Sequence, residues 1–165
     1  EILKTTEIDF IINCAGIGVF EPHEELSIQQ IENLIAINLT APIVLTNLAL
    51  RYLKKTKGII INIASIEATR HSKFSGVYTA TKAGLRDFSL SLFEEVRKSG
   101  VRVTSLNPDM TLTPFFDTLK FQPSTKEANH LRADEVADVV LDIVSSPIAI
   151  TDITLRSQYF GIEKK

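Results

Sequence analysis

The sequence predicts an α/β fold in which a parallel sheet is covered by helices on both faces. Four short runs rich in Ile and Val alternate with three longer segments of helical periodicity, which is typical of parallel strands joined by crossover helices. The runs are continuous rather than alternating, as in strands buried on both faces. With 165 residues, 44% of them hydrophobic, residues 1–165 suffice for a single domain with a sizeable core.

The expected elements follow one another in strand–helix order. The strands are expected at residues 8–13, 58–64, 101–106 and 148–155. The helices are expected at residues 28–55, with a bend near Pro42, and at residues 76–98 and 133–145. Ser27 is a suitable N-cap for the first helix, Gly100 ends the second and Pro147 follows the third.

Two segments have no regular pattern. Residues 108–132 lack a clear period and are expected to form a functional lid or loop, since unstructured connectors of that length are uncommon. Residues 163–165 are expected to form a solvated tail.

The amino-acid composition argues against several classes of binding partner. The net charge is −2, so there is no basic field to attract nucleic acid or an anionic membrane. The apolar runs are expected to be too short to span a bilayer, and residues 1–9 lack the features of a signal peptide. Cys14 is the single cysteine, which fits a cytoplasmic location. The three histidines have no metal-ligand spacing, and we expect no metal site.

Tyr78 and Lys82 are the most informative pair of residues. They lie four apart in a segment of helical periodicity, so one helix face places a phenol beside an ammonium group. A positive charge about 5 Å away favours the phenolate and lowers the pKa of a tyrosine by roughly two units. Such a tyrosine can exchange a proton with an alcohol or carbonyl oxygen. A pair at this spacing also occurs as surface decoration of ordinary helices.

Other polar residues follow the strands. Asn13-Cys-Ala-Gly16 follows the first expected strand, Ser65 the second and Asn107-Pro-Asp109 the third. Ligands of open parallel sheets bind at the carboxyl ends of the strands. We therefore expect these residues to meet Tyr78 and Lys82 at one edge of the sheet.

Taken together, these motifs resemble the short-chain dehydrogenase/reductase family, whose members are Rossmann-fold oxidoreductases. The matching residues, in family order, are the turn Asn13-Cys-Ala-Gly16, the helix residue Asn38, Ser65 after the next strand, the pair Tyr78 and Lys82, and Pro108 with Thr113. The resemblance implies a doubly wound parallel sheet. The chain would supply its C-terminal two-thirds, with about four strands and three long helices.

The resemblance also implies the chemistry, a hydride transfer between NAD or NADP and an alcohol or ketone. Tyr78 would be the acid/base, with Lys82 lowering its pKa and holding the nicotinamide ribose. Ser65 would polarise the substrate oxygen, and Asn38 would hold a water of a proton relay. The residues implied to contact the cofactor are Asn13, Ala15, Gly16, Tyr78, Lys82, Pro108, Asp109 and Thr113.

The sequence departs from the family pattern in three ways. Cys14 replaces an Asn of the turn and is expected to be a small buried residue. Asp109 replaces a Gly, which makes the cofactor contacts of that loop less certain. The family's glycine-rich phosphate motif does not occur. We therefore expect the C-terminal part of a longer dehydrogenase, with residues 10–12 as an exposed apolar edge strand.

Two further expectations concern partners. An apolar substrate wall is one interpretation of Phe74, Phe115, Phe116, Phe121 and Met110; ordinary loop packing is the other. Family members commonly form homodimers or homotetramers through the two long helices, here residues 28–55 and 76–98. Leu45, Phe88 and Leu92 are candidates for that interface, although core packing explains them equally well. The alternative function is a non-catalytic binding or dimerisation module.

Overall fold

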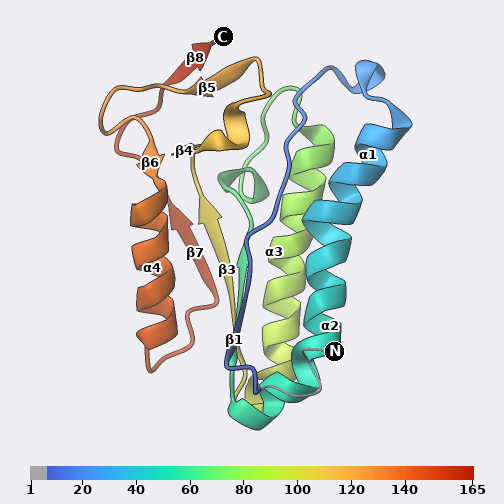
Figure 1. Ribbon diagram of the computed structural model, residues 1–165, viewed down its shortest axis with the longest axis vertical. Coiled ribbons are helices and arrows are strands. Elements are labelled where there is room, and N and C mark those ends of the chain that lie inside the picture. The colour runs from blue at the N-terminus through green and yellow to red at the C-terminus, as the bar shows by residue number, and fades with distance from the viewer. Residues whose placement is uncertain (1–6) are drawn as a thin grey trace.

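A computed structural model describes residues 7–165, and its centre is a four-stranded parallel sheet in the order β1-β2-β3-β7 (Figure 1). Its strands are β1 (Phe10–Asn13), β2 (Ile59–Ile63), β3 (Arg102–Pro108) and β7 (Asp152–Leu155). The parallel α/β class is confirmed, although β1 and β7 begin later than expected. The opening residues 1–6, part of the segment without signal-peptide features, lie outside the described residues.

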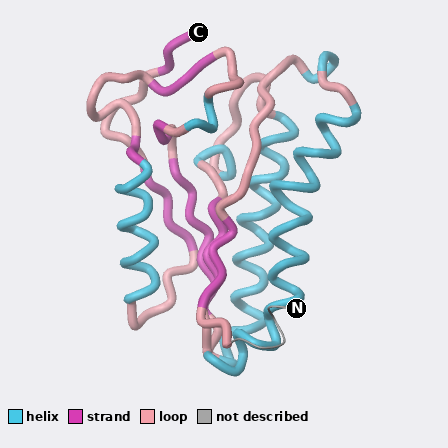
Figure 2. The backbone as a smooth tube through the Cα atoms, in the orientation of Figure 1, coloured by secondary structure: helices cyan, strands magenta, loops and turns pink. Residues whose placement is uncertain are grey.

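Helices cover both faces of the sheet, and each face has its own core. Figure 2 shows α4 (Ala133–Ser145) on one side and the remaining long helices on the other. Adjacent residues of β2 alternate between the two cores: Ile60 packs with Leu53 and Leu92, whereas Ile61 packs with Ile143 of α4. Both cores bury fully enclosed aliphatic side chains, so the hydrophobic effect holds the helices on the sheet.

The first long helix is interrupted where the sequence predicted a bend. Helix α1 (Ile28–Ile35) begins with a capping box in which Ser27 and Gln30 each accept from the other's backbone N–H. A π-helical turn, η3 (Ala36–Thr40), then leads into α2 (Ala41–Thr56). Pro42 has no N–H to donate to the carbonyl of Asn38, four residues earlier, and proline is a common cause of such an interruption.

The helix that carries Tyr78 and Lys82 is α3 (Gly76–Val96). It continues as one 3₁₀ turn, η5 (Arg97–Ser99), and ends at Gly100 with φ 83°. That left-handed conformation favours glycine and confirms the expected stop. Two short 3₁₀ turns elsewhere, η2 (His23–Glu25) and η4 (Ile66–Ala68), belong to loops beside the carboxyl ends of the strands.

The loop and the C-terminal tail build a cover over the carboxyl ends of the sheet (Figure 1). The loop contains β4 (Thr111–Leu112), η6 (Pro114–Phe116), β5 (Phe121–Pro123) and β6 (Leu131–Arg132). Strand β4 pairs with β6, and β5 pairs antiparallel with β8 (Ile162–Lys164). The expectation of a solvated tail was wrong, because these residues complete a small sheet with a strand 40 residues earlier in the chain.

Among the exposed apolar side chains of the described residues, those of β1 and of the first long helix bear on the expectations above. Strand β1 lies at the end of the sheet, with Phe10 52% and Ile12 40% exposed, as expected for an edge strand. The continuous segment Ile28–Thr56 is long and apolar enough to cross a membrane, contrary to our expectation from shorter runs. Its inner face packs against α3 and the sheet, as in a core helix.

Candidate active site

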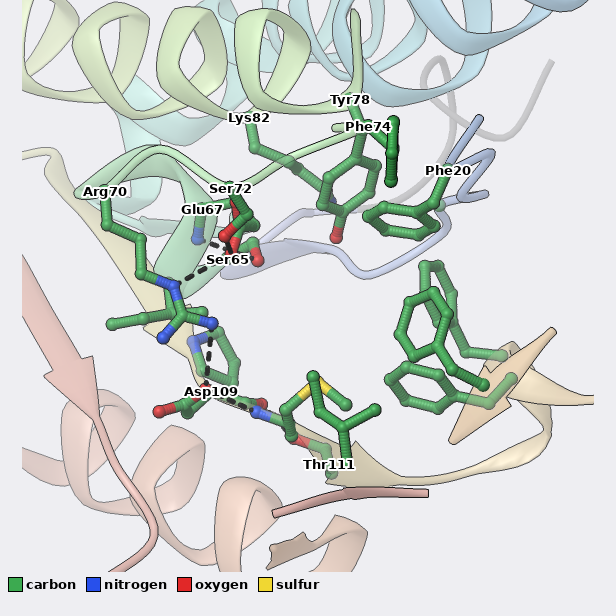
Figure 3. Close-up of a pocket in the computed structure, with 18 of the residues that line it drawn as sticks. Phe20, Ser65, Glu67, Arg70, Ser72, Phe74, Tyr78, Lys82, Asp109 and Thr111 are labelled. Atoms are coloured by element: carbon green, nitrogen blue, oxygen red, sulfur yellow. Dashed lines mark hydrogen bonds and ion pairs between the residues drawn. The ribbon is translucent and has the colours of Figure 1, made fainter. Parts of the chain in front are cut away.

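A cavity of about 1410 Å³ opens at the carboxyl ends of the strands, beneath the cover (Figure 3). Most of the expected site residues line it, namely Ala15, Gly16, Ser65, Tyr78, Lys82, Pro108, Asp109 and Thr113. They arrive from the ends of β1, β2 and β3 and from the first turns of α3. The parallel sheet thus brings together residues that are far apart in the sequence.

Ser65 and Tyr78 face one another in this cavity. Ser65 follows β2, and its Oγ accepts from the backbone N–H of Glu67 at 3.2 Å. Ser65 also lies close enough to the Tyr78 hydroxyl to favour the phenolate and so to lower the pKa of Tyr78. Because a serine hydroxyl can donate while it accepts, this arrangement can bind one oxygen atom of a ligand between two hydroxyl groups.

Lys82 lies one helical turn beyond Tyr78. Its Nζ donates to the carbonyl oxygen of Ile63 at 2.9 Å and lies 5.9 Å from the centroid of the Tyr78 ring. Both side chains are buried. The spacing in the sequence therefore predicted the pairing correctly, with the ammonium held by the end of β2.

The expected lowering of the Tyr78 pKa was wrong for this structure. Burial disfavours the phenolate and raises the pKa of Tyr78 to about 12; Ser65 opposes that rise only in part. Burial also lowers the pKa of Lys82 to about 8. Desolvation penalises the charged form of each group, and the negative charge of Glu67 adds to the rise at Tyr78. Tyr78 therefore carries its proton at neutral pH.

Asn38 and Asn13 lie outside the residues that line the cavity. The buried Asn38 amide exchanges two hydrogen bonds of 2.9 Å with the backbone of Ile17 and donates to Thr81. It therefore ties the loop after Gly16 to η3 and α3. Asn13 donates to the side chain of Asn62 at 2.7 Å, so it holds β1 and β2 together where they end.

The two residues that replace family residues, Cys14 and Asp109, differ in their surroundings. Cys14 is exposed and lines the cavity, so the expectation of a buried residue was wrong. Asp109 is buried, and its carboxylate accepts from the N–H of Met110 at 2.9 Å. Arg70 and Arg156 approach it at 3.6 and 3.4 Å.

Arg70 extends this ion pair into a network across the cavity (Figure 3). Its Nε donates at 2.8 Å to the buried carboxylate of Glu67, which also accepts from Ser72 and Ser75. The network thus connects the loop after Ser65 with the end of β3. The sequence analysis missed Glu67 and Arg70, although a charged pair three apart, directly after a strand end, was a signal that could have found them.

Aromatic side chains form another part of the cavity lining. Phe20, which the sequence analysis did not select, has its ring centroid 5.0 Å from that of Tyr78. Phe115 lies 6.1 Å from the Tyr78 ring on another side. All five residues of the expected substrate wall line the cavity, namely Phe74, Met110, Phe115, Phe116 and Phe121.

Acidic, thiol and imidazole groups do not gather into a metal site in the described part of the chain. Within residues 7–165, no three side chains of His, Cys, Asp or Glu lie close enough together to hold a metal ion. The polar groups that do converge on the cavity are suited to binding an oxygen atom and exchanging a proton.

Sequence relatives identify the family of the chain. Residues 2–123 match the family described as short chain dehydrogenase. The chain is 31% identical over 152 residues to an uncharacterised oxidoreductase of Staphylococcus epidermidis, covering 90% of this chain and 64% of that protein. It is 33% identical over 150 residues to serine 3-dehydrogenase of Agrobacterium fabrum, covering 86% and 59%. The chain thus spans about two-thirds or less of the length of these relatives.

Solved structures agree with the sequence match. An alcohol dehydrogenase from Thermococcus sibiricus, complexed with 5-hydroxy-NADP, superposes with a TM-score of 0.85 at 26% identity, covering 96% of this chain and 66% of that one. Serine dehydrogenase from Escherichia coli superposes with a TM-score of 0.79 at 25% identity, covering 93% and 67%. The fold, the residues at the strand ends and the matched segment lead to one conclusion: the chain belongs to the short-chain dehydrogenase family.

Proposed function

We propose that the protein containing this chain is an oxidoreductase that moves a hydride between NAD or NADP and an alcohol or ketone. The observation that carries the proposal is the juxtaposition of Ser65, Tyr78 and Lys82 around one side of an open cavity. The relatives named serine 3-dehydrogenase and alcohol dehydrogenase support the same reaction class.

In this proposal Tyr78 is the acid in the direction of carbonyl reduction. It holds its proton at neutral pH because its pKa is about 12, and it releases that proton to the substrate oxygen as the carbonyl becomes an alcohol. Ser65 donates a hydrogen bond to the same oxygen. Lys82, with a pKa of about 8, is predominantly cationic at neutral pH and stabilises negative charge that develops on the phenol oxygen.

The turn after β1 fits a nicotinamide cofactor, which would supply the hydride. A Cβ at Gly16 would lie 3.3 Å from Lys82 Nζ and 3.4 Å from Asn38 Oδ1, so a side chain here would crowd both groups. We assign Ala15 and Gly16, with Lys82, to one edge of the nicotinamide and ribose. The residues assigned to the remaining contacts are Asn13, through the turn that it begins, Tyr78, Pro108, Asp109 and Thr113.

Substitution of Tyr78 by Phe tests the proposal. We expect turnover of ketones with NADH or NADPH to fall by about 10²–10⁴-fold, because the acid is removed while the ring remains. Tyr52→Phe is the matched control, since Tyr52 lies on α2 outside the cavity lining and should retain full turnover. Undiminished turnover in Tyr78→Phe, measured in the protein that contains the complete cofactor site, would overturn the assignment.

We also propose that the chain forms a homodimer or homotetramer through its long helices. Val44, Leu45 and Leu48 expose one apolar face of α2, whereas the other interface candidates belong to the core: Leu92 is buried and Phe88 packs against it. This face also supports the alternative function, a dimerisation module without turnover.

Charge substitution on α2 tests the oligomer. Leu45→Glu should convert the oligomer into monomers in size-exclusion chromatography with light scattering, because it places a carboxylate in an apolar contact. Leu141→Glu is the control, since Leu141 is as exposed but lies on α4. Identical masses for both variants and the parent would contradict the proposed interface.

The proposed location is the cytoplasm, and the proposed partners are small molecules rather than nucleic acid or membranes. The single cysteine, Cys14, is exposed as a free thiol, which a reducing compartment preserves. With a net charge of −2, the chain has no excess of positive charge that would attract a polyanion such as nucleic acid.

A further inference from the structure

We propose that the cavity selects alcohols or ketones whose reacting carbon carries a flat, apolar ring, and that Phe20, Phe74, Phe115 and Phe121 bind this ring. These four residues are called the aromatic wall below. The proposal rests on the function proposed above, because it concerns the substrate of that same cavity. It is carried by the arrangement of the wall around Tyr78.

Three residues of the aromatic wall, Phe20, Phe115 and Phe121, are connected with Tyr78 by successive ring contacts. Phe20 lies 5.0 Å from Tyr78 and 5.2 Å from Phe121, and Phe115 lies 6.1 Å from Tyr78. Phe116 joins Phe115 to Phe121 at 5.1 and 5.8 Å. Separations of this size are typical of tilted and edge-to-face aromatic pairs. The rings therefore converge on the hydroxyl-bearing residue to which the reaction is assigned.

Loop packing alone does not account for the exposure of these rings. Phe116 is buried and serves as the core of the cluster, whereas Phe20, Phe115 and Phe121 are half-buried and line the cavity. Apolar surface inside a concave site binds ligands by releasing water. A ligand ring would complete the packing that the protein leaves open on this side.

Phe74 extends the wall to the mouth of the cavity from a strained backbone. Its φ is 63°, a left-handed conformation that is exceptional for a bulky residue and collects at functional sites. Ser75 stabilises the turn by donating to the Ser72 carbonyl at 2.8 Å. Phe74 lines the cavity, and its side chain is 57% exposed.

The position of the wall depends on Gly18. A Cβ at this residue would lie 2.5 Å from Cζ of Phe115 and 2.7 Å from Cε2 of Phe20. Both rings therefore pack directly on the backbone of the loop after β1, which sets them back from the centre of the cavity. A side chain at position 18 would push both rings, so the glycine allows them to pack against this loop while they line the cavity beside Tyr78.

The polar side of the cavity is occupied by its own ion pairs. The buried carboxylates of Glu67 and Asp109 are matched by Arg70 and Arg156. A small zwitterion such as serine would have to compete with these contacts, whereas an apolar ring meets none of them on the wall. Discrimination is therefore assigned to the wall.

Binding of simple ketones tests the proposal without requiring turnover. Acetophenone and acetone share the reacting carbonyl group and differ in the ring, and L-serine carries neither a ring nor a ketone. Saturation-transfer NMR titrations of the protein that contains this chain should give a dissociation constant for acetophenone at least about tenfold below that for acetone. Equal constants for the two ketones, or preferential binding of L-serine, would overturn the proposal.

Two variants of the aromatic wall test whether acetophenone binds there. Phe74→Ala should weaken the binding of acetophenone about three- to tenfold and leave the binding of acetone unchanged. The Phe74 side chain is 57% exposed, so its removal does not open the core. Phe115→Leu keeps an apolar side chain but removes the aromatic ring, and it should also weaken the binding of acetophenone. Tyr159→Ala removes a comparably exposed aromatic ring outside the cavity lining and is the control. Equal effects of Phe74→Ala and Tyr159→Ala would contradict the assignment.

Tyr78→Phe separates this proposal from the proposed function. The variant should bind acetophenone as the parent does, because the ring at position 78 remains, while turnover is lost. Loss of turnover with acetophenone still preferred supports both proposals. Full turnover in the variant contradicts the assigned acid, and absence of a preference for acetophenone contradicts only the aromatic wall.

Discussion

The two sides of the cavity are built in different ways. The framework side consists of Ser65, Tyr78 and Lys82, which are buried and attached to β2 and α3. The loop side consists of residues 109–125 and 156–165, whose short strands are tied by contacts between residues about 40 apart in the sequence, such as Ser124 with Glu163. Regular elements thus position the groups assigned to chemistry, and irregular segments shape the space for the substrate.

The largest expected effect concerns the burial of Lys82 on the framework side. Its pKa falls from 10.5 to about 8 on folding, so between pH 8 and 10.5 the unfolded chain binds more protons than the folded one. The free energy of unfolding should therefore rise with pH in this window, by roughly 3 kcal/mol in all. Tyr78, with a raised pKa of about 12, opposes this only above pH 10.

Denaturant unfolding of Lys82→Met between pH 7 and 10 measures this contribution. Methionine has no titrating group, so the variant should lose the rise in stability that the parent shows from pH 8 to 10. Lys98→Met, at an exposed position in η5, should keep the rise. A parent whose stability falls steadily over this range would mean that Lys82 is not penalised by burial.

The next effect concerns the network that joins the two sides. Asp109→Asn keeps an acceptor for the Met110 N–H but removes the charge paired with Arg70 and Arg156. We expect the free energy of unfolding to fall by about 1–3 kcal/mol, because a buried charge-assisted contact is lost. Asp138→Asn, at an exposed position of α4, is the control. Equal stability in the two variants would mean that the ion pairs of Asp109 do not stabilise the fold.

The framework side could be predicted from the sequence because its geometry is local. The spacing of Tyr78 and Lys82 sets one helix face, and parallel pairing then brings Ser65 to the same edge. The sequence did not reveal that burial raises the pKa of Tyr78, since desolvation depends on everything packed around it. The positive charge of Lys82, four residues away, had predicted that the pKa of Tyr78 would be lowered.

For the loop side, the sequence predicted some of the residues that line the cavity but not how they pack. Its phenylalanines were candidates for a substrate wall, but Phe20, from another loop, was missed. The pairing of β5 with β8 was also missed, because two three-residue strands with no shared periodicity give no local signal. Long-range contacts of this kind are set by the completed fold rather than by the spacing of neighbouring residues.

The smallest expected effect concerns the hydrogen bonds of Glu163 that connect the two segments of the loop side. Glu163 accepts from the Ser124 hydroxyl at 2.8 Å and from the Thr125 N–H at 3.0 Å, and these bonds lower its pKa. Glu163→Gln removes the charge that strengthens both bonds. Amide hydrogens of residues 121–125 should then exchange faster with deuterium, while those of α3 keep their protection.

This local response distinguishes the two sides of the cavity. Glu95→Gln makes the same chemical change at an exposed position of α3 and should leave exchange in residues 121–125 unaltered. If Glu163→Gln also accelerates exchange in α3, the cover and the framework open as one unit. If only residues 121–125 respond, the substrate side can loosen while Ser65, Tyr78 and Lys82 stay in place, since no regular element carries the disturbance from β8 to α3.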